Sequence, residues 1–145
     1  MLRFSLYEVL PGSSVFADFY EEPEPKKWLL FDFLNDMYGQ EDLYLAEIAK
    51  AEAGEPADIY NHSIHAYFYP DYAVLEDMND PDLQDPAAAG PRRCIRLPLP
   101  EAKQLILDWL EAKRRWFQQP ISAADKSPLP SASPAHGQTG GGPAP

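Results

Sequence analysis

The chain has 145 residues, with 12 basic and 23 acidic side chains, and 45% of its residues are hydrophobic. This length fits one domain, and the apolar content can fill a core, which excludes a wholly disordered chain. The single cysteine excludes an internal disulfide framework and a cysteine-based zinc finger. No apolar run approaches the roughly 20 residues of a membrane helix, and Glu8 falls where a signal peptide would be apolar. We therefore expect a cytoplasmic protein without a membrane partner.

Alternating side chains predict a strand at the start of the chain. Large apolar residues alternate with polar ones over residues 2–10, which is typical of a half-buried strand, and Pro11-Gly12 ends the pattern. Residues 15–20 fit either a second strand or a short helix.

Two helices are expected next. Apolar residues over 26–38 recur with helical spacing, and Gly39 follows as a stop. The opposite face of this helix is expected to carry Asp32, Asn35 and Asp36. Residues 41–53 predict a second helix, which Gly54 ends. Its apolar stripe is expected to consist of Leu45, Ile48 and Ala49.

From Ile59 onwards the pattern changes to that of a sheet. Residues 64–69 alternate in period two, Pro70-Asp71 forms a turn, and residues 72–75 form a short strand, so an antiparallel hairpin is predicted. Residues 79–91 contain three prolines and are expected to form a long surface loop. Residues 94–97 read as a further short strand.

A final helix over 101–117 has the clearest amphipathic pattern in the chain. Its expected inner stripe is Ala102, Leu105, Ile106, Trp109, Leu110 and Lys113. The fold class is therefore α+β, a small antiparallel sheet packed against about three helices in a single domain over residues 1–117. Residues 118–145 hold six prolines and four glycines, and a segment of this composition is expected to be a disordered tail.

Charge is segregated along the chain. Residues 1–91 hold 19 acidic and four basic side chains, whereas residues 92–117 hold three acidic and seven basic ones. The acidic segment over residues 1–91 is expected to repel nucleic acid phosphates and to attract a basic protein partner.

No nucleotide-binding or hydrolase motif occurs in the sequence, and we expect neither enzymatic activity nor a cofactor. His62 and His65 have a spacing that metal ligands can use on a helix, but a strand pattern surrounds them and points them to opposite sides. Cys94 lies among arginines that could lower a thiol pKa, yet it begins an apolar strand, where a small buried residue is ordinary. We therefore expect no metal site and no catalytic residue.

Tyrosines beside carboxylates in the hairpin and the following loop form the best candidate for a partner-binding surface. Such side chains can anchor and pair with basic groups of another protein. The candidate residues are Tyr69, Asp71, Tyr72, Glu76, Asp77, Asp80, Asp82 and Asp85.

Three segments together have a familiar order. Residues 28–36 (WLLFDFLND) precede an acidic helix, a hairpin over 64–76 follows, and the chain closes with 95–110 (IRLPLPEAKQLILDWL). This order resembles the small immunity proteins of bacterial polymorphic toxin and contact-dependent inhibition systems. The resemblance implies a non-enzymatic inhibitor that binds a cognate, basic toxin domain in the cytoplasm.

Two other functions stay open at this point. An adaptor protein would use the tail as a tether. A small enzyme or metal protein would depend on His62, His65 or Cys94.

Overall fold

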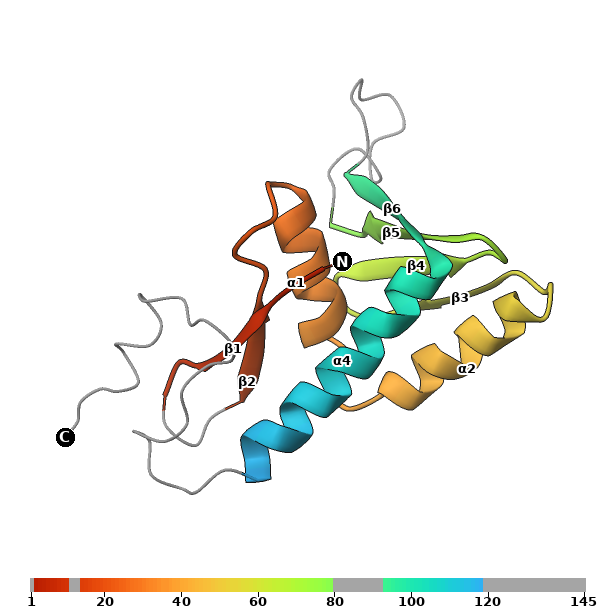
Figure 1. Ribbon diagram of the computed structural model, residues 1–145. Coiled ribbons are helices and arrows are strands. Elements are labelled where there is room, and N and C mark those ends of the chain that lie inside the picture. Colours follow the sequence, from red (N-terminus) through yellow and green to blue (C-terminus); the bar gives the residue numbers. More distant parts are fainter. Residues whose placement is uncertain (1, 11–13, 80–92, 119–145) are drawn as a thin grey trace.

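The computed structural model describes residues 2–10, 14–79 and 93–118. Over these residues the chain forms three helices, a two-stranded sheet and a four-stranded sheet, both antiparallel, which confirms the α+β fold (Figure 1). The strands are β1 (Ser5–Glu8), β2 (Val15–Asp18), β3 (Ala57–Tyr60), β4 (Ile64–Phe68), β5 (Tyr72–Asp77) and β6 (Cys94–Pro98). The helices are α1 (Lys26–Asn35), α2 (Glu41–Glu52) and α4 (Leu99–Gln118).

The N-terminal hairpin settles the ambiguity over residues 15–20. Ser5 of β1 pairs with Asp18 of β2 in an antiparallel register, so this segment is a strand. Leu6 and Ala17 are fully buried, and β2 packs against α1. The period-two pattern of the first ten residues thus corresponds to one edge of the core.

The helical pattern predicted that Asn35 lies on the solvent-facing side of α1. In the structure it instead contacts strand β2. Its side-chain Oδ1 accepts a hydrogen bond from the Ala17 backbone N–H at 2.9 Å, and its Nδ2 donates to the Ala17 carbonyl at 3.3 Å. The Asn35 amide thereby pairs with the backbone N–H and C=O of Ala17, as a neighbouring strand would. A helical wheel cannot predict this contact, because it depends on a distant segment.

The buried stripe of α2 is rotated from the predicted one. Ile48 is buried and Leu45 is half-buried against the core, as predicted, but Ala49 is exposed. Tyr44 and Ala51 are buried together with Ile48, because α2 packs between β3 and α4 along that side. The Tyr44 ring meets Phe33 of α1 edge-on at 5.7 Å between centroids.

A buried carboxylate joins α2 to α4. Glu41 is only 3% exposed, and its Oε2 accepts hydrogen bonds from Trp109 Nε1 at 2.9 Å and from Lys113 Nζ at 2.5 Å. The Lys113 ammonium also lies over the Trp109 ring, 4.6 Å from its centroid. The predicted inner stripe of α4 faces the core, with Leu110 and Lys113 half-buried at its margin, and Trp116 is buried on the same helix.

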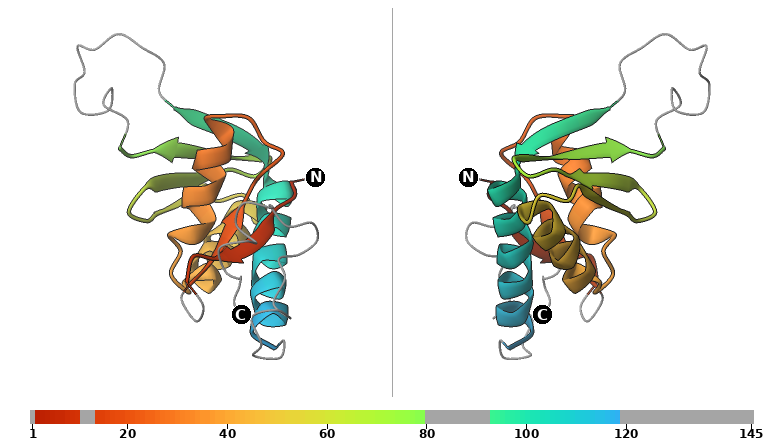
Figure 2. Two further views of the ribbon diagram at one scale, coloured as in Figure 1. Left: turned by 90° about the vertical axis from the view of Figure 1, so that its left-hand side faces the viewer. Right: turned by 90° about the vertical axis from the view of Figure 1, so that its right-hand side faces the viewer.

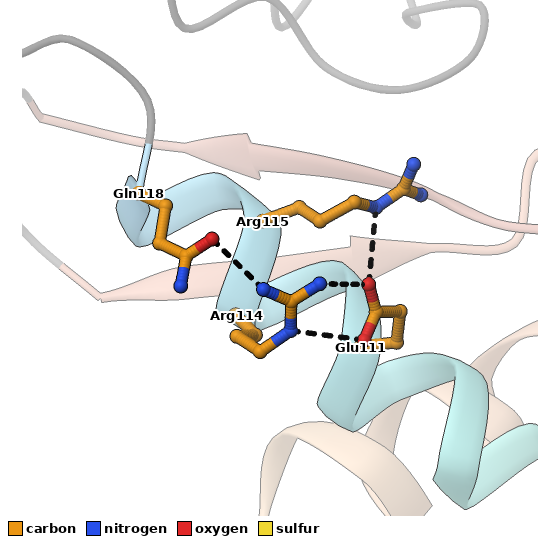
Figure 3. Close-up of polar contacts among 4 residues, drawn as sticks. All are labelled: Glu111, Arg114, Arg115 and Gln118. Atoms are coloured by element: carbon orange, nitrogen blue, oxygen red, sulfur yellow. Dashed lines mark hydrogen bonds and ion pairs between the residues drawn. The ribbon is translucent and has the colours of Figure 1, made fainter.

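The C-terminal end of α4 carries ion pairs within the helix itself. Arg114 donates to Glu111 and to Gln118, and Arg115 lies 3.8 Å from Glu111 (Figure 3). Hydrogen bonding from Arg114 lowers the pKa of the Glu111 carboxyl. Gln118 is the last residue of α4, so the helix runs one residue into the segment expected as a tail. The remainder of that tail and residues 80–91 of the expected loop lie outside the described residues.

The four-stranded sheet has the order β3-β4-β5-β6, and every neighbouring pair is antiparallel. The predicted hairpin is confirmed as β4 and β5, with Ile64 opposite Asp77 and Phe68 opposite Ala73. The three helices gather on one side of this sheet, where the core lies (Figure 2).

Candidate functional site

Alternate residues of the four strands point to two different environments. On the side of the helices, Ile64, Phe68 and Leu75 are at most 1% exposed. Residues of opposite parity are half-buried or exposed, and no described helix or strand packs over them (Figure 2). We call this second surface the open face; it consists of Asp58, Tyr60, His65, Tyr67, Tyr72, Val74, Glu76, Cys94 and Arg96.

A hydrogen-bonded network crosses three strands of the open face. His65 Nε2 lies 2.7 Å from Asp58 Oδ2, and His65 Nδ1 lies 3.1 Å from the Tyr67 hydroxyl. The Tyr67 hydroxyl is also 3.4 Å from Glu76 Oε1. Burial and the Glu76 charge raise the pKa of Tyr67, so its hydroxyl stays protonated and can donate to either neighbour. The imidazole and phenol rings stack with centroids 4.1 Å apart.

A second aromatic group lies at the β4–β5 turn. The rings of Tyr69 and Tyr72 stack at 4.7 Å between centroids, and the Arg96 guanidinium lies 3.6 Å from the Tyr72 ring centroid. These contacts hold flat side chains in fixed orientations, which lowers the conformational entropy that binding would cost. The open face is therefore a preorganised surface of aromatic and polar groups.

The structure keeps part of the predicted binding surface together. Tyr72 and Glu76 belong to the open face, Tyr69 stacks beside them, and Asp71 is exposed in the turn next to them. Three further predicted residues, Asp80, Asp82 and Asp85, lie outside the described residues.

Asp77, although part of the predicted surface, does not lie on the open face. It is 7% exposed and lies on the helix side of β5, in the same parity as Ala73 and Leu75. Its Oδ2 pairs with the Arg93 guanidinium at 2.5 Å, and its Oδ1 accepts the Asn79 backbone N–H at 2.8 Å. The period of the strand, which places Glu76 outward, necessarily turns Asp77 inward.

Sequence reasoning missed the centre of the open face. His65 was considered only together with His62 as a metal pair, and Tyr67, Asp58 and Arg96 were not among the predicted binding residues. In the described part of the chain, no group of three or more histidine, cysteine, aspartate and glutamate side chains could hold a metal ion. Cys94 was expected to be buried, but it is exposed, because it lies on the outward parity of β6. The alternation that gave the strands already indicated these outward positions.

A polar hollow lies between α1 and the end of β5. Its volume is about 240 Å³, and Trp28, Asp32, Asp77 and Arg93 line it. Burial, followed by the charges of Asp36 and Asp77, raises the pKa of Asp32 to about 6, against an opposing effect of Arg93. Around Asp32, the negative charges of Asp36 and Asp77 therefore outweigh the positive charge of Arg93.

Comparison with known protein families, with curated proteins and with solved structures finds no match. Among the described helices, none combines the length and the apolar character that crossing a membrane requires. The fold and the site thus define an acidic α+β protein with a one-sided antiparallel sheet whose uncovered face is aromatic.

Proposed function

We propose that the protein is a non-enzymatic inhibitor, the immunity partner of a basic bacterial toxin domain in the cytoplasm, and that the open face is its binding surface. The observation that carries this proposal is the composition of that face. Beside the charged side chains of Asp58, Glu76 and Arg96, this face carries three tyrosines, at positions 60, 67 and 72. Tyrosine and arginine are enriched in protein interfaces and among the residues that dominate binding energy.

The overall charge supports a basic partner. A formal net charge of −11 attracts a basic protein over distances that single contacts do not reach and accelerates its encounter. Neutralisation then follows from covering the partner's active site. The charge sets the rate of association, and the aromatic groups of the open face set the lifetime of the complex.

Co-expression with a toxin-like domain encoded next to this chain tests the proposal. We expect the chain to restore growth of cells that produce the domain, and purified proteins to associate more slowly as salt rises, with less change in the dissociation rate. Absence of growth rescue would remove the immunity function. Rescue with salt-independent association would retain the function and reject electrostatic steering.

A further inference from the structure

A hollow of about 350 Å³ lies between the α1–α2 turn and the turn from β3 to β4. Its lining includes Asp36, Tyr38, Gln40, Tyr60, Asn61 and His62. It is separate from the hollow beside Asp77 and adjoins the open face at Tyr60, whose ring lies 5.6 Å from that of His65. An occupant of this hollow would therefore also contact the edge of the open face.

Two tyrosines form exposed walls of the hollow. Tyr38 is 74% exposed and Tyr60 is 66% exposed, values that exclude a role for either ring in the core. Tyr38 has a backbone φ of 50°, in the left-handed region that disfavours a bulky residue and favours glycine or asparagine. The His62 ring meets the Tyr38 ring edge-on at 6.2 Å.

The third component of the hollow is a carboxylate that pairs with none of the basic side chains in the described part of the chain. Asp36 is half-buried and accepts a hydrogen bond from Ser63 Oγ at 2.5 Å. No basic side chain of residues 2–10, 14–79 or 93–118 lies within ion-pair distance of it. The negative charge of Asp36 is one of the causes that raise the pKa of Asp32, four residues earlier on α1.

We propose that this hollow binds an arginine side chain that the partner protein presents. The guanidinium is flat enough to stack on tyrosine rings, and its N–H groups can donate to a single carboxylate in the fork geometry that arginine favours. Lysine would gain the charge contact but lose the stacking. This inference rests on the proposed function, because it names one contact of the same complex.

Nuclear magnetic resonance titration with N-acetyl-arginine-amide tests the site without the partner protein. The uncharged analogue N-acetyl-citrulline-amide has nearly the same shape and serves as the matched ligand control. We expect saturable shifts at Tyr38, Tyr60 and His62 with arginine and at least tenfold weaker binding with citrulline, since loss of a charge-assisted contact typically costs this much. Equal responses to the two ligands, or shifts elsewhere on the chain, would overturn the site.

Two variants locate the contact. Asp36→Asn preserves an acceptor for Ser63 but removes the charge, and we expect about tenfold weaker binding of the arginine probe. Glu55→Gln changes the net charge equally at an exposed loop position and should leave the affinity unchanged. Tyr38→Asn removes one wall at a backbone position that asparagine tolerates, so it should weaken the probe without lowering the melting temperature. Unchanged affinity in Asp36→Asn would contradict the proposal.

The same variants separate this inference from the proposed function. If the chain rescues growth but Asp36→Asn binds the toxin domain as tightly as the native chain, the arginine contact is wrong and the immunity function stands. If the arginine probe binds as described but the chain fails to rescue growth, the hollow is a guanidinium site and the immunity function is wrong.

Discussion

The two faces of the four-stranded sheet are built from the same strands but differ in the exposure and the chemical type of their side chains. The covered face presents Ile64, Phe68 and Leu75 to the helices with at most 1% exposure. The open face presents rings and charges, such as Tyr67 and Arg96, which a cross-strand hydrogen bond to Glu76 and stacking on Tyr72 hold in place. Side-chain parity thus assigns the core to one face and leaves the other face for the recognition that we propose. Substitutions on the two sides should accordingly change different measured quantities.

The largest effect on stability is expected at Trp109, where α4 closes over the covered side. Trp109→Ala should lower the free energy of unfolding by about 3–5 kcal/mol, the usual range for a large aromatic side chain removed from a core. Trp28→Ala is the matched control, because Trp28 is 46% exposed, and it should cost under about 1 kcal/mol. Guanidinium chloride unfolding gives both values. Equal losses in the two variants would contradict the assignment of the core to this side.

A smaller effect is expected from the buried carboxylate that joins α2 to α4. Glu41→Gln removes a charge that Trp109 and Lys113 both contact and should cost about 1–3 kcal/mol. Glu52→Gln is the control, since Glu52 pairs with Lys103 between the same two helices but is 44% exposed in its side chain, and it should change stability by under about 0.5 kcal/mol. Urea unfolding of both variants distinguishes them, and a Glu52→Gln loss as large as that of Glu41→Gln would show that burial does not matter here.

A pH-dependent effect is expected at Asp32, which lines the same hollow as Asp77 of β5. The folded-state pKa of Asp32 is raised from 3.8 to about 6, so the folded chain holds this proton more tightly than the unfolded chain. The contribution of Asp32 to stability therefore falls as pH rises through this window. Asp32→Asn should be about 1 kcal/mol more stable than the native chain at pH 7, after allowance for solvent screening, and equally stable near pH 3.5.

Thermal unfolding at both pH values measures this difference, with Glu55→Gln as the charge-matched control. A gain in the Asp32→Asn variant that persists undiminished at the acidic pH would show that titration of Asp32 is not its source.

The smallest stability effect is expected on the open face. Tyr67→Phe removes one half-exposed hydroxyl from the network with His65 and Glu76 and should cost under about 1 kcal/mol. Differential scanning calorimetry of the variant against the native chain tests this. A cost as large as that of Trp109→Ala would show that the open face contributes to the fold, and the division between the two faces would fail.

Local periodicity was enough to predict most of the elements and part of the site. The strand alternation gave β4 and β5, and the 3.6-residue spacing gave the inner stripe of α4, because both are properties of neighbouring residues. Tyr72 and Glu76 were predicted because tyrosines lie beside carboxylates in this segment, and the same criterion included Asp77, which the strand period turns inward.

Features that depend on contacts between distant segments could not be predicted. The rotation of α2 follows from its position between β3 and α4, and the role of Asn35 follows from the proximity of Ala17 on another element. Burial of Glu41 requires the approach of Trp109 and Lys113, which lie 68 and 72 residues further along the chain. The hollow at Tyr38 likewise combines the α1–α2 turn with the end of β3, and no residue spacing in the sequence predicts it.

The affinity of the toxin domain for two double variants tests the central claim most directly. One variant, Tyr67→Ala with Tyr72→Ala, removes rings of the open face. The other, Leu43→Ala with Leu107→Ala, truncates leucines on α2 and α4 that are 53% and 39% exposed. With folding verified by circular dichroism, we expect the tyrosine variant to bind at least about 100-fold more weakly and the leucine variant to bind like the native chain. A large loss in the leucine variant, together with native affinity in the tyrosine variant, would place the interface on the helices and contradict the account.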